Sequence, residues 1–253
     1  MRGRHHPTFS NHQAETGGMC TSDEMQATLF ALGQAVEQRD GNTGTHCQRL
    51  AYLGVAMGVC MGLDREALVA LYRGGYLHDV GKVGIPDSIL LKPGQLTSEE
   101  WIVMRTHTTQ GEEICRHVNS LAPVLPIIRH HHERWDGSGY PDGLSGDRIP
   151  LLARVLQVAD IYDALTNPRP YRTACTPARA LQIVCDEGAR GWRDPEVVKV
   201  FLALHHEVLS PSGPDSATSG SVEAIAISLA NLDRSVRLAF PSGDGALLNL
   251  PLH

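Results

Sequence analysis

The stretch from Gly75 to Pro86 offers two kinds of metal ligand at one point, the imidazole of His78 and the adjacent carboxylate of Asp79. Both lie at the end of an apolar helical pattern, and Lys82 follows three residues after Asp79. Imidazole nitrogen and carboxylate oxygen together suit a divalent transition metal. Because one pair cannot fill a coordination sphere, further ligands must come from other parts of the chain.

Other histidines and aspartates fall on the apolar faces of predicted helices or at the helix ends: His46, His107, His131, His132 and Asp160. Their spacing relative to apolar neighbours predicts that His46 faces inward from a helix beginning near Thr45, and His107 from a helix over residues 97–118. Asp160 lies within an apolar helix over residues 151–165, where a carboxylate is costly unless it is paired or metal-bound.

One histidine on an apolar face is usually structural. Seven such His and Asp side chains in one bundle would leave many uncompensated polar groups in its interior, so they predict a shared metal site. A nitrogen and oxygen ligand set without thiolates favours iron or manganese in octahedral geometry over a closed structural zinc site.

The elements that must position these residues are all predicted to be helices between residues 21 and 208. Capping patterns mark several starts, at Asp64, at Thr97 with Glu100, at Thr176 and at Asp194. The fold class predicted for this region is therefore an all-α helical bundle.

The two ends of the chain read differently from the bundle. Residues 1–20 are polar and lack periodicity, so we expect a disordered tail. Residues 209–221 are rich in Ser, Gly and Pro and are predicted to form a linker. Apolar residues then alternate within residues 222–253, which predicts a small β-rich C-terminal appendage.

Composition limits the class of protein. The chain has 253 residues, enough for one large domain or one domain with an appendage, and a formal charge of -6, which argues against general nucleic-acid binding. The six cysteines are scattered and are expected to be reduced thiols. No signal-peptide core and no apolar run of membrane-spanning length is visible, so we expect a cytoplasmic protein. Oligomeric state and input signal are left open.

A set of motifs in fixed order resembles the HD-GYP family over about residues 40–205. The matching stretches are His78-Asp79-Val-Gly-Lys82, Gly84-Ile-Pro-Asp87, Leu91-Lys-Pro-Gly94, His131-His-Glu-Arg-Trp-Asp-Gly-Ser-Gly-Tyr-Pro141, Ile149-Pro150, Ala159-Asp-Ile-Tyr-Asp-Ala-Leu-Thr166 and Arg169-Pro-Tyr-Arg172. The family is an all-helical subset of the HD phosphohydrolases, and its usual activity is hydrolysis of cyclic di-GMP to pGpG or GMP. The resemblance implies an HD-type helical bundle.

The resemblance also implies which residues hold metal: His78, Asp79, His107, His131, His132 and Asp160, with Asp79 bridging two ions. His46 resembles a ligand of members with a third metal, but those members carry a glutamate four residues earlier, where this chain has Asn42. We therefore expect two divalent metal ions, iron or manganese, with His46 lining the site, binding weakly or supporting a ligand. Asp163 is expected to orient a ligand.

Four residues are candidates for catalysis or for substrate contact. Lys82 could contact the phosphate or assist the leaving oxygen; the alternative is a surface ion pair. Arg169 and Arg172 offer guanidinium forks to the substrate phosphates, and the alternative is a solvated loop. Tyr140 could stack on guanine or pack structurally. The Gly139-Tyr140-Pro141 loop could shape the substrate mouth, contact a signalling protein or form a structural turn.

Three functions are weighed on this basis. The leading one is a metal-dependent cyclic di-GMP phosphodiesterase acting in second-messenger signalling. The second is an HD phosphohydrolase for another nucleotide or cyclic dinucleotide, against which the Tyr-Pro loop and the arginine pair argue. The third is a catalytically weak signalling adaptor that acts through protein contacts, which the intact ligand set disfavours.

Overall fold

The computed structural model describes residues 22–40, 45–168 and 173–206, and this part of the chain contains helices and turns but no strand. The α-helices are α1 (Ser22–Arg39), α2 (His46–Cys60), α3 (Arg65–Leu77), α4 (Asp87–Leu90), α5 (Ser98–Arg105), α6 (His107–Cys115), α7 (Leu125–His130), α8 (Leu151–Thr166), α9 (Pro177–Ala189) and α10 (Pro195–Leu204). Short 3-10 helices are η1 (Val80–Gly84), η2 (Asn119–Leu121) and η3 (Gly146–Arg148). The all-α prediction is confirmed, whereas the predicted tail, linker and β appendage lie outside the described residues.

Helix starts follow the predicted caps. The Asp64 carboxylate accepts the Ala67 N–H at 2.9 Å at the start of α3, and Thr97 and Glu100 form the predicted reciprocal capping box before α5. Thr176 and Asp194 accept backbone N–H groups at the starts of α9 and α10. These starts were predictable because a cap is an interaction within one turn of chain.

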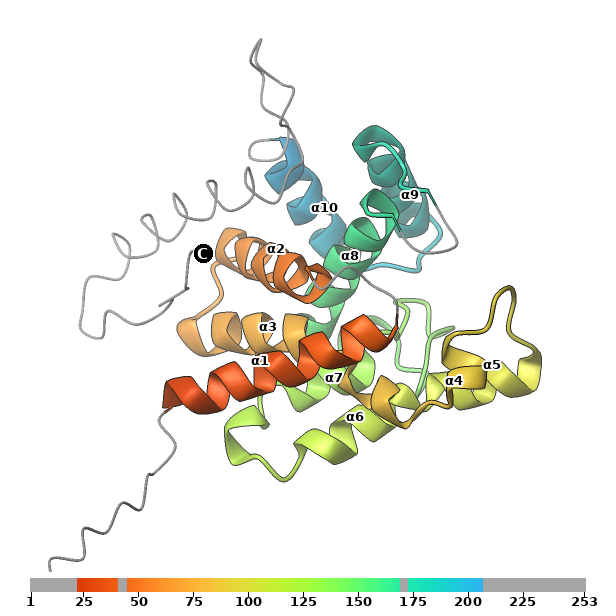
Figure 1. Ribbon diagram of the computed structural model, residues 1–253. Helices are drawn as coiled ribbons and strands as arrows, with labels where there is room; N and C mark the ends of the chain where they lie inside the picture. Colours follow the sequence, from red (N-terminus) through yellow and green to blue (C-terminus); the bar gives the residue numbers. More distant parts are fainter. Residues whose placement is uncertain (1–21, 41–44, 169–172, 207–253) are drawn as a thin grey trace, which may run out of the picture.

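The core forms where α2 packs on α3 and α8, while α10 packs on α2, α8 and α9 (Figure 1). Leu50, Met57, Leu71, Leu156 and Phe201 are completely buried there. Helix α7 lies against α6 and α8, and α1 packs along α3. The carboxyl ends of α3 and α7, which carry the histidine motifs, are thereby held by the same core.

Gly75 lets α3 approach α2 closely. A Cβ at this position would collide with the backbone of Ala51. The backbone of α2 thus approaches α3 closely at Gly75, one turn before His78. The missing side chain allows α2 and α3 to bring His46 and His78 together, with their ring centroids 5.5 Å apart.

The helix that leads to His78 ends directly before it. Helix α3 ends at Leu77, and the 3-10 helix η1 begins at Val80. Asp79 lies between them with φ -101° and ψ 8°, a conformation between the helical and extended regions. The bend at Asp79 directs its carboxylate and the following Lys82 to the same region.

The prediction of a single helix over residues 97–118 is wrong, because the structure has two helices there, α5 and α6, which are separated at Thr106. The Thr106 hydroxyl donates to the Val103 carbonyl at 2.7 Å, and the Thr108 and Thr109 hydroxyls bond in the same way to carbonyls three residues earlier. Such bonds compete with the regular helical ladder. The break makes His107 the first residue of α6.

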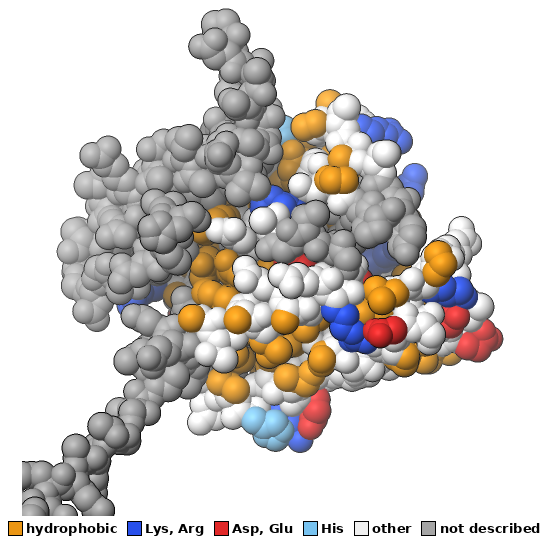
Figure 2. Space-filling view, in the orientation of Figure 1, with side chains coloured by type: hydrophobic (Ala, Val, Ile, Leu, Met, Phe, Trp, Pro, Cys, Tyr) orange, Lys and Arg blue, Asp and Glu red, His pale blue; other side chains and the backbone are white. Residues whose placement is uncertain are grey.

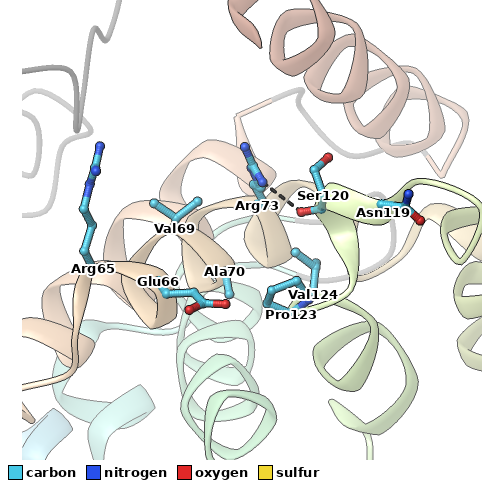
Figure 3. Close-up of a pocket in the computed structure, with 9 residues that line it drawn as sticks. All are labelled: Arg65, Glu66, Val69, Ala70, Arg73, Asn119, Ser120, Pro123 and Val124. Carbon is cyan, nitrogen blue, oxygen red and sulfur yellow. Dashed lines mark hydrogen bonds between the residues drawn. The ribbon is translucent and has the colours of Figure 1, made fainter. Parts of the chain in front are cut away.

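The surface shows two further features. Hydrophobic side chains gather over the region of α1 on the face in Figure 2, and Leu32 of α1 is 40% exposed. A groove of ≈ 530 Å³ lies between α3 and the η2–α7 region, with Arg73 donating to the Ser120 carbonyl at 3.0 Å (Figure 3). None of its lining residues belongs to the predicted metal site.

No described helix has the length and apolar character needed to cross a bilayer.

Candidate metal centre

Asp79 lies at the centre of the predicted ligand set. One carboxylate oxygen, Oδ1, is 3.3 Å from His107 Nε2 and 3.7 Å from His131 Nε2. The other oxygen, Oδ2, is 3.2 Å from His78 Nε2. The carboxylate therefore faces different histidines with its two oxygens, as a bridging ligand would.

The ligand atoms of the predicted residues fall into two neighbouring groups. Asp79, His107, His131 and His132 form one, with ligand atoms within 4.8 Å of one another. His46, His78 and Asp160 form the other, with the same spacing. The structure thus brings together all six residues predicted as ligands, and it adds His46 to the second group. Each group mixes nitrogen and oxygen donors, a ligand chemistry that suits divalent metal ions.

The orientation of three imidazoles fits metal binding. The Nδ1 atoms of His78, His107 and His131 lie 3.2, 2.8 and 2.9 Å from the carbonyl oxygens of Gly75, Met104 and Ile128. A carbonyl accepts only from a protonated Nδ1, so each neutral ring carries its lone pair on Nε2.

These Nε2 atoms and Asp79 Oδ1 are buried and make no hydrogen bond. Buried polar atoms without a partner are costly, and several of them directed at one point fit a site that holds a cation.

Burial and neighbouring charge set the protonation states. Burial lowers the pKa of His107 to about 4, and burial together with His131 and His107 holds the pKa of His132 well below its usual range. Burial would raise the pKa of Asp79, but Lys82 and His78 hold it well below its ordinary value. Near neutral pH His107 and His132 therefore present neutral imidazoles and Asp79 presents an ionised carboxylate, which are the forms that bind metal.

Lys82 is part of this cluster rather than a surface ion pair. Its Nζ lies 2.8 Å from Asp79 Oδ2 and 2.6 Å from Asp40 Oδ2, and its side chain is 15% exposed. Burial lowers the pKa of Lys82, but Asp79 and Asp40 outweigh this and raise it, so the ammonium stays charged. That Lys82 contacts the phosphate or assists the leaving oxygen stays a prediction.

Asp163 contacts the Nδ1 side of the His46 ring, in agreement with the expectation that Asp163 orients a ligand. The Asp163 carboxylate lies 2.6 Å from His46 Nδ1 and also pairs with the Arg49 guanidinium at 2.5 Å, and all three side chains are buried. His46 Nε2 then faces Asp160 Oδ1 at 3.5 Å. The position agrees with the expectation that His46 lines the site; whether it binds metal stays a prediction. Asn42 lies outside the described residues.

Of the other residues predicted to contact substrate, only Tyr140 lies in the part of the chain that the structure describes. Tyr140 lies at the site, with its ring stacked on His132 at a centroid distance of 4.8 Å. Arg169 and Arg172 lie outside the described residues, so their proposed phosphate contact stays a prediction.

Asp40 is a site residue that the sequence interpretation missed. It follows α1 directly and reaches Lys82, 42 residues away. One signal was available, because a carboxylate at the C-terminal end of a helix is disfavoured by the helix dipole and calls for a cationic partner. Arg39 beside it donates to the carbonyls of Lys82, Val83 and Ile85, which holds η1 against the end of α1.

Comparison with known proteins agrees with this geometry. A family model described as HD domain matches residues 31–197, which is 167 of the 253 residues. The chain belongs to the HD domain family. The resemblance drawn from the His-Asp and Gly-Tyr-Pro motifs is thereby confirmed at the level of the family.

Several curated relatives of this HD domain chain are named as phosphodiesterases. A cyclic di-GMP phosphodiesterase response regulator of Xanthomonas campestris pv. campestris is 42% identical over 177 residues, covering 69% of this chain and 47% of the relative. A 3'3'-cGAMP-specific phosphodiesterase of Vibrio cholerae is 38% identical over 205 residues, covering 80% of this chain and 38% of the relative. The chain thus spans less than half the length of these two relatives.

A solved structure supports the fold. The crystal structure of a cyclic GMP-AMP-specific phosphodiesterase of Vibrio cholerae superposes with a TM-score of 0.58 at 21% identity, covering 81% of this chain and 53% of the other. At this level of identity the likeness supports the shared helical architecture.

Proposed function

We propose that this chain hydrolyses cyclic di-GMP to pGpG or GMP with a dinuclear centre of iron or manganese. The observation that carries the proposal is the placement of Asp79, with its two oxygens facing the two ligand groups. Bound divalent ions supply Lewis acidity and neutralise charge in phosphodiester cleavage. The proposed ligands are His78, Asp79, His107, His131, His132 and Asp160.

The chain's own residues have distinct proposed tasks. The neutral imidazoles of His107 and His132 offer lone pairs without a proton to displace. Lys82, charged and fixed between Asp40 and Asp79, supplies a positive group beside the cluster that could contact a phosphate oxygen. Arg169 and Arg172 are proposed to bind the substrate phosphates. The intact set of ligands supports the enzyme proposal over the signalling adaptor.

A second substrate has a specific observation in its favour. The Vibrio cholerae relative at 38% identity is named for 3'3'-cGAMP. Both cyclic dinucleotides carry the same two phosphodiesters and differ in one base, so the metal centre does not discriminate between them. Base contacts must decide, and Tyr140 of the 139–141 loop lies beside the ligands His107 and His132, with ring centroids 6.3 and 4.8 Å away.

The test is turnover by protein purified anaerobically and loaded with Mn²⁺ or Fe²⁺. Cyclic di-GMP and 3'3'-cGAMP are supplied separately, and linear dinucleotide and mononucleotide products are followed by chromatography. We expect hydrolysis of cyclic di-GMP at the higher kcat/KM. Preference for 3'3'-cGAMP would transfer the proposal to the second substrate, and hydrolysis of neither by metal-loaded protein would overturn the enzyme proposal.

A further inference from the structure

His132 differs from the other candidate histidine ligands in what holds its ring. His78, His107 and His131 each have Nδ1 fixed by a backbone carbonyl, whereas the His132 ring makes no hydrogen bond to any described residue. Metal-binding histidines are normally oriented by a partner on the second nitrogen. Another contact must therefore set the direction of the His132 ring.

Three rings contact His132, and the Tyr140 ring is the one stacked on it, whereas the rings of His131 and His107 are inclined to it by 44° and 83°. The plane of the Tyr140 ring is inclined by 28° to the His132 ring at a centroid distance of 4.8 Å, which is a stacked arrangement. The Tyr140 N–H also donates to the His132 carbonyl at 3.3 Å, so backbone and ring approach the same residue. Within the described residues the Tyr140 hydroxyl has no hydrogen-bond partner, so the ring rather than the hydroxyl makes the contact.

The loop that carries Tyr140 is anchored by a buried carboxylate. Glu133 has no exposed surface, and its two oxygens accept the N–H groups of Asp142 at 2.7 Å and Leu144 at 3.1 Å. His130 Nδ1 lies 3.8 Å from Glu133 Oε1, but burial lowers the pKa of His130, so this ring offers no positive charge near neutral pH. A buried carboxylate requires such charge-assisted bonds to offset its loss of hydration. Glu133 therefore fixes the backbone directly after Tyr140.

Two neighbouring features keep the same loop against residues 131–134. A Cβ on Gly139 would collide with the backbone of Glu133 and Arg134, so a residue without a side chain is needed there. Asp142 is held in turn by two hydrogen bonds of 2.8 Å from Arg129. The loop is thus held against the rest of the protein on both sides of Tyr140.

We propose that Tyr140 is a positioning residue that orients the His132 imidazole toward Asp79, and that Glu133 holds Tyr140 in place. The proposal rests on the metal centre proposed above and assigns Tyr140 a task other than hydrogen bonding to the substrate. Two substitutions distinguish the role of the Tyr140 ring from that of its hydroxyl, because phenylalanine retains the stack on His132 and leucine removes it. Glu133→Gln places an amide donor against a backbone donor and should release the loop.

The experiment compares Tyr140→Phe, Tyr140→Leu and Glu133→Gln with Asp147→Asn as the matched control. Asp147 follows the same loop, but its side chain is 90% exposed and pairs with Arg154, which also has Asp194. Two readouts need no turnover. One is the imidazole ring-proton resonances of ¹⁵N-histidine-labelled, metal-free protein, and the other is Mn²⁺ affinity by electron paramagnetic resonance.

We expect Tyr140→Leu and Glu133→Gln to remove the ring-current shift of His132 and to weaken Mn²⁺ binding about 10- to 100-fold. Tyr140→Phe and Asp147→Asn should retain both. Circular dichroism identifies any variant that does not fold, and Glu133→Gln still tests the proposal if Tyr140→Leu does not.

The opposite pattern would overturn the proposal. If Tyr140→Leu keeps the Mn²⁺ affinity and the His132 resonance while Tyr140→Phe alone raises KM, the hydroxyl binds substrate instead. Absence of turnover in the wild-type protein contradicts the proposed function but leaves the resonance and Mn²⁺ measurements valid, so the two failures are distinguishable.

Discussion

The Lys82 ammonium lies 2.6 Å from the Asp40 carboxylate, which connects the end of α1 to the metal-ligand cluster through Asp79. The pair joins residues 42 positions apart, and both side chains are largely buried. An ammonium held between two carboxylates has a fixed position, which is the property that a phosphate-binding or proton-donating group needs.

Asp40→Asn is expected to lower kcat/KM by about 10- to 100-fold, because Lys82 loses one of the two carboxylates that position it. Metal content should stay at the wild-type value, since Asp40 belongs to neither ligand group. Steady-state kinetics and metal analysis of the same preparations measure both.

Asp87→Asn is the matched control, because Asp87 is 69% exposed and pairs with Arg39, the neighbour of Asp40. Arg39 retains its three carbonyl acceptors in that variant. An equal loss of activity in both variants would show that the end of α1, and not the Lys82 contact, is responsible.

Metal removal should lower stability as well as activity. An ion that binds only the folded chain at 100 times its Kd adds about 2.7 kcal/mol, which corresponds to a fall in Tm of about 5 to 10 °C on chelation. Asp79→Ala should contain no metal, show no turnover and have a Tm that does not respond to chelator. A chelator-dependent Tm in Asp79→Ala would place the stabilising ion elsewhere.

Gly81→Ala should weaken both stability and metal binding. A Cβ at Gly81 would collide with the His107 carbonyl and the Gly111 N–H, so η1 must move away from α6. We expect a loss of about 1 to 3 kcal/mol in the free energy of unfolding, as for other overpacked sites. The same displacement separates Asp79 from His107, so Mn²⁺ affinity should fall in the same variant.

Gly188→Ala is its control, because a Cβ there meets Val198 only at ordinary contact distances of 3.5 to 3.8 Å. That change in α9 should be neutral or stabilising by up to ~1 kcal/mol through helix propensity. Equal destabilisation of both variants in urea titrations would contradict the close η1–α6 contact.

Asp163 should make stability depend on pH. Burial raises its pKa, but Arg49 and His46 more than offset this and hold it below its usual range. A carboxylate with a lowered folded-state pKa stabilises the fold fully above its unfolded pKa of about 3.9, and the contribution is lost as pH falls through the folded value. Asp163→Asn should therefore cost about 3 kcal/mol near pH 7, because Arg49 stays buried without its counter-charge.

Urea unfolding of wild type and Asp163→Asn in the presence of chelator, from pH 7 to pH 3, measures the difference without a contribution from metal. The gap should be constant down to about pH 5 and close in more acidic solution. A gap that widens in acid would mean that the Asp163 pKa is raised rather than lowered.

The sequence alone determined those features that arise within a few turns of chain. Helix starts at Asp64, Thr97, Thr176 and Asp194 follow from caps that bond to the next turn. The inward faces of His46, His107 and His131 follow from helical periodicity, and all three side chains are buried. The order of the motifs along the chain was sufficient to identify the family.

Only the tertiary structure decided which of these residues meet. Periodicity gives the face of a helix but not its neighbour. The resemblance implied which residues hold metal, but their division into two groups and the contact of Asp40 with Lys82 came only from the structure. The break at Thr106 depends on hydroxyl bonds that compete with the helix, and the approach of η1 to α6 depends on Gly81. The stack of Tyr140 on His132 likewise exists because Glu133 folds the loop back, a contact that sequence spacing does not encode.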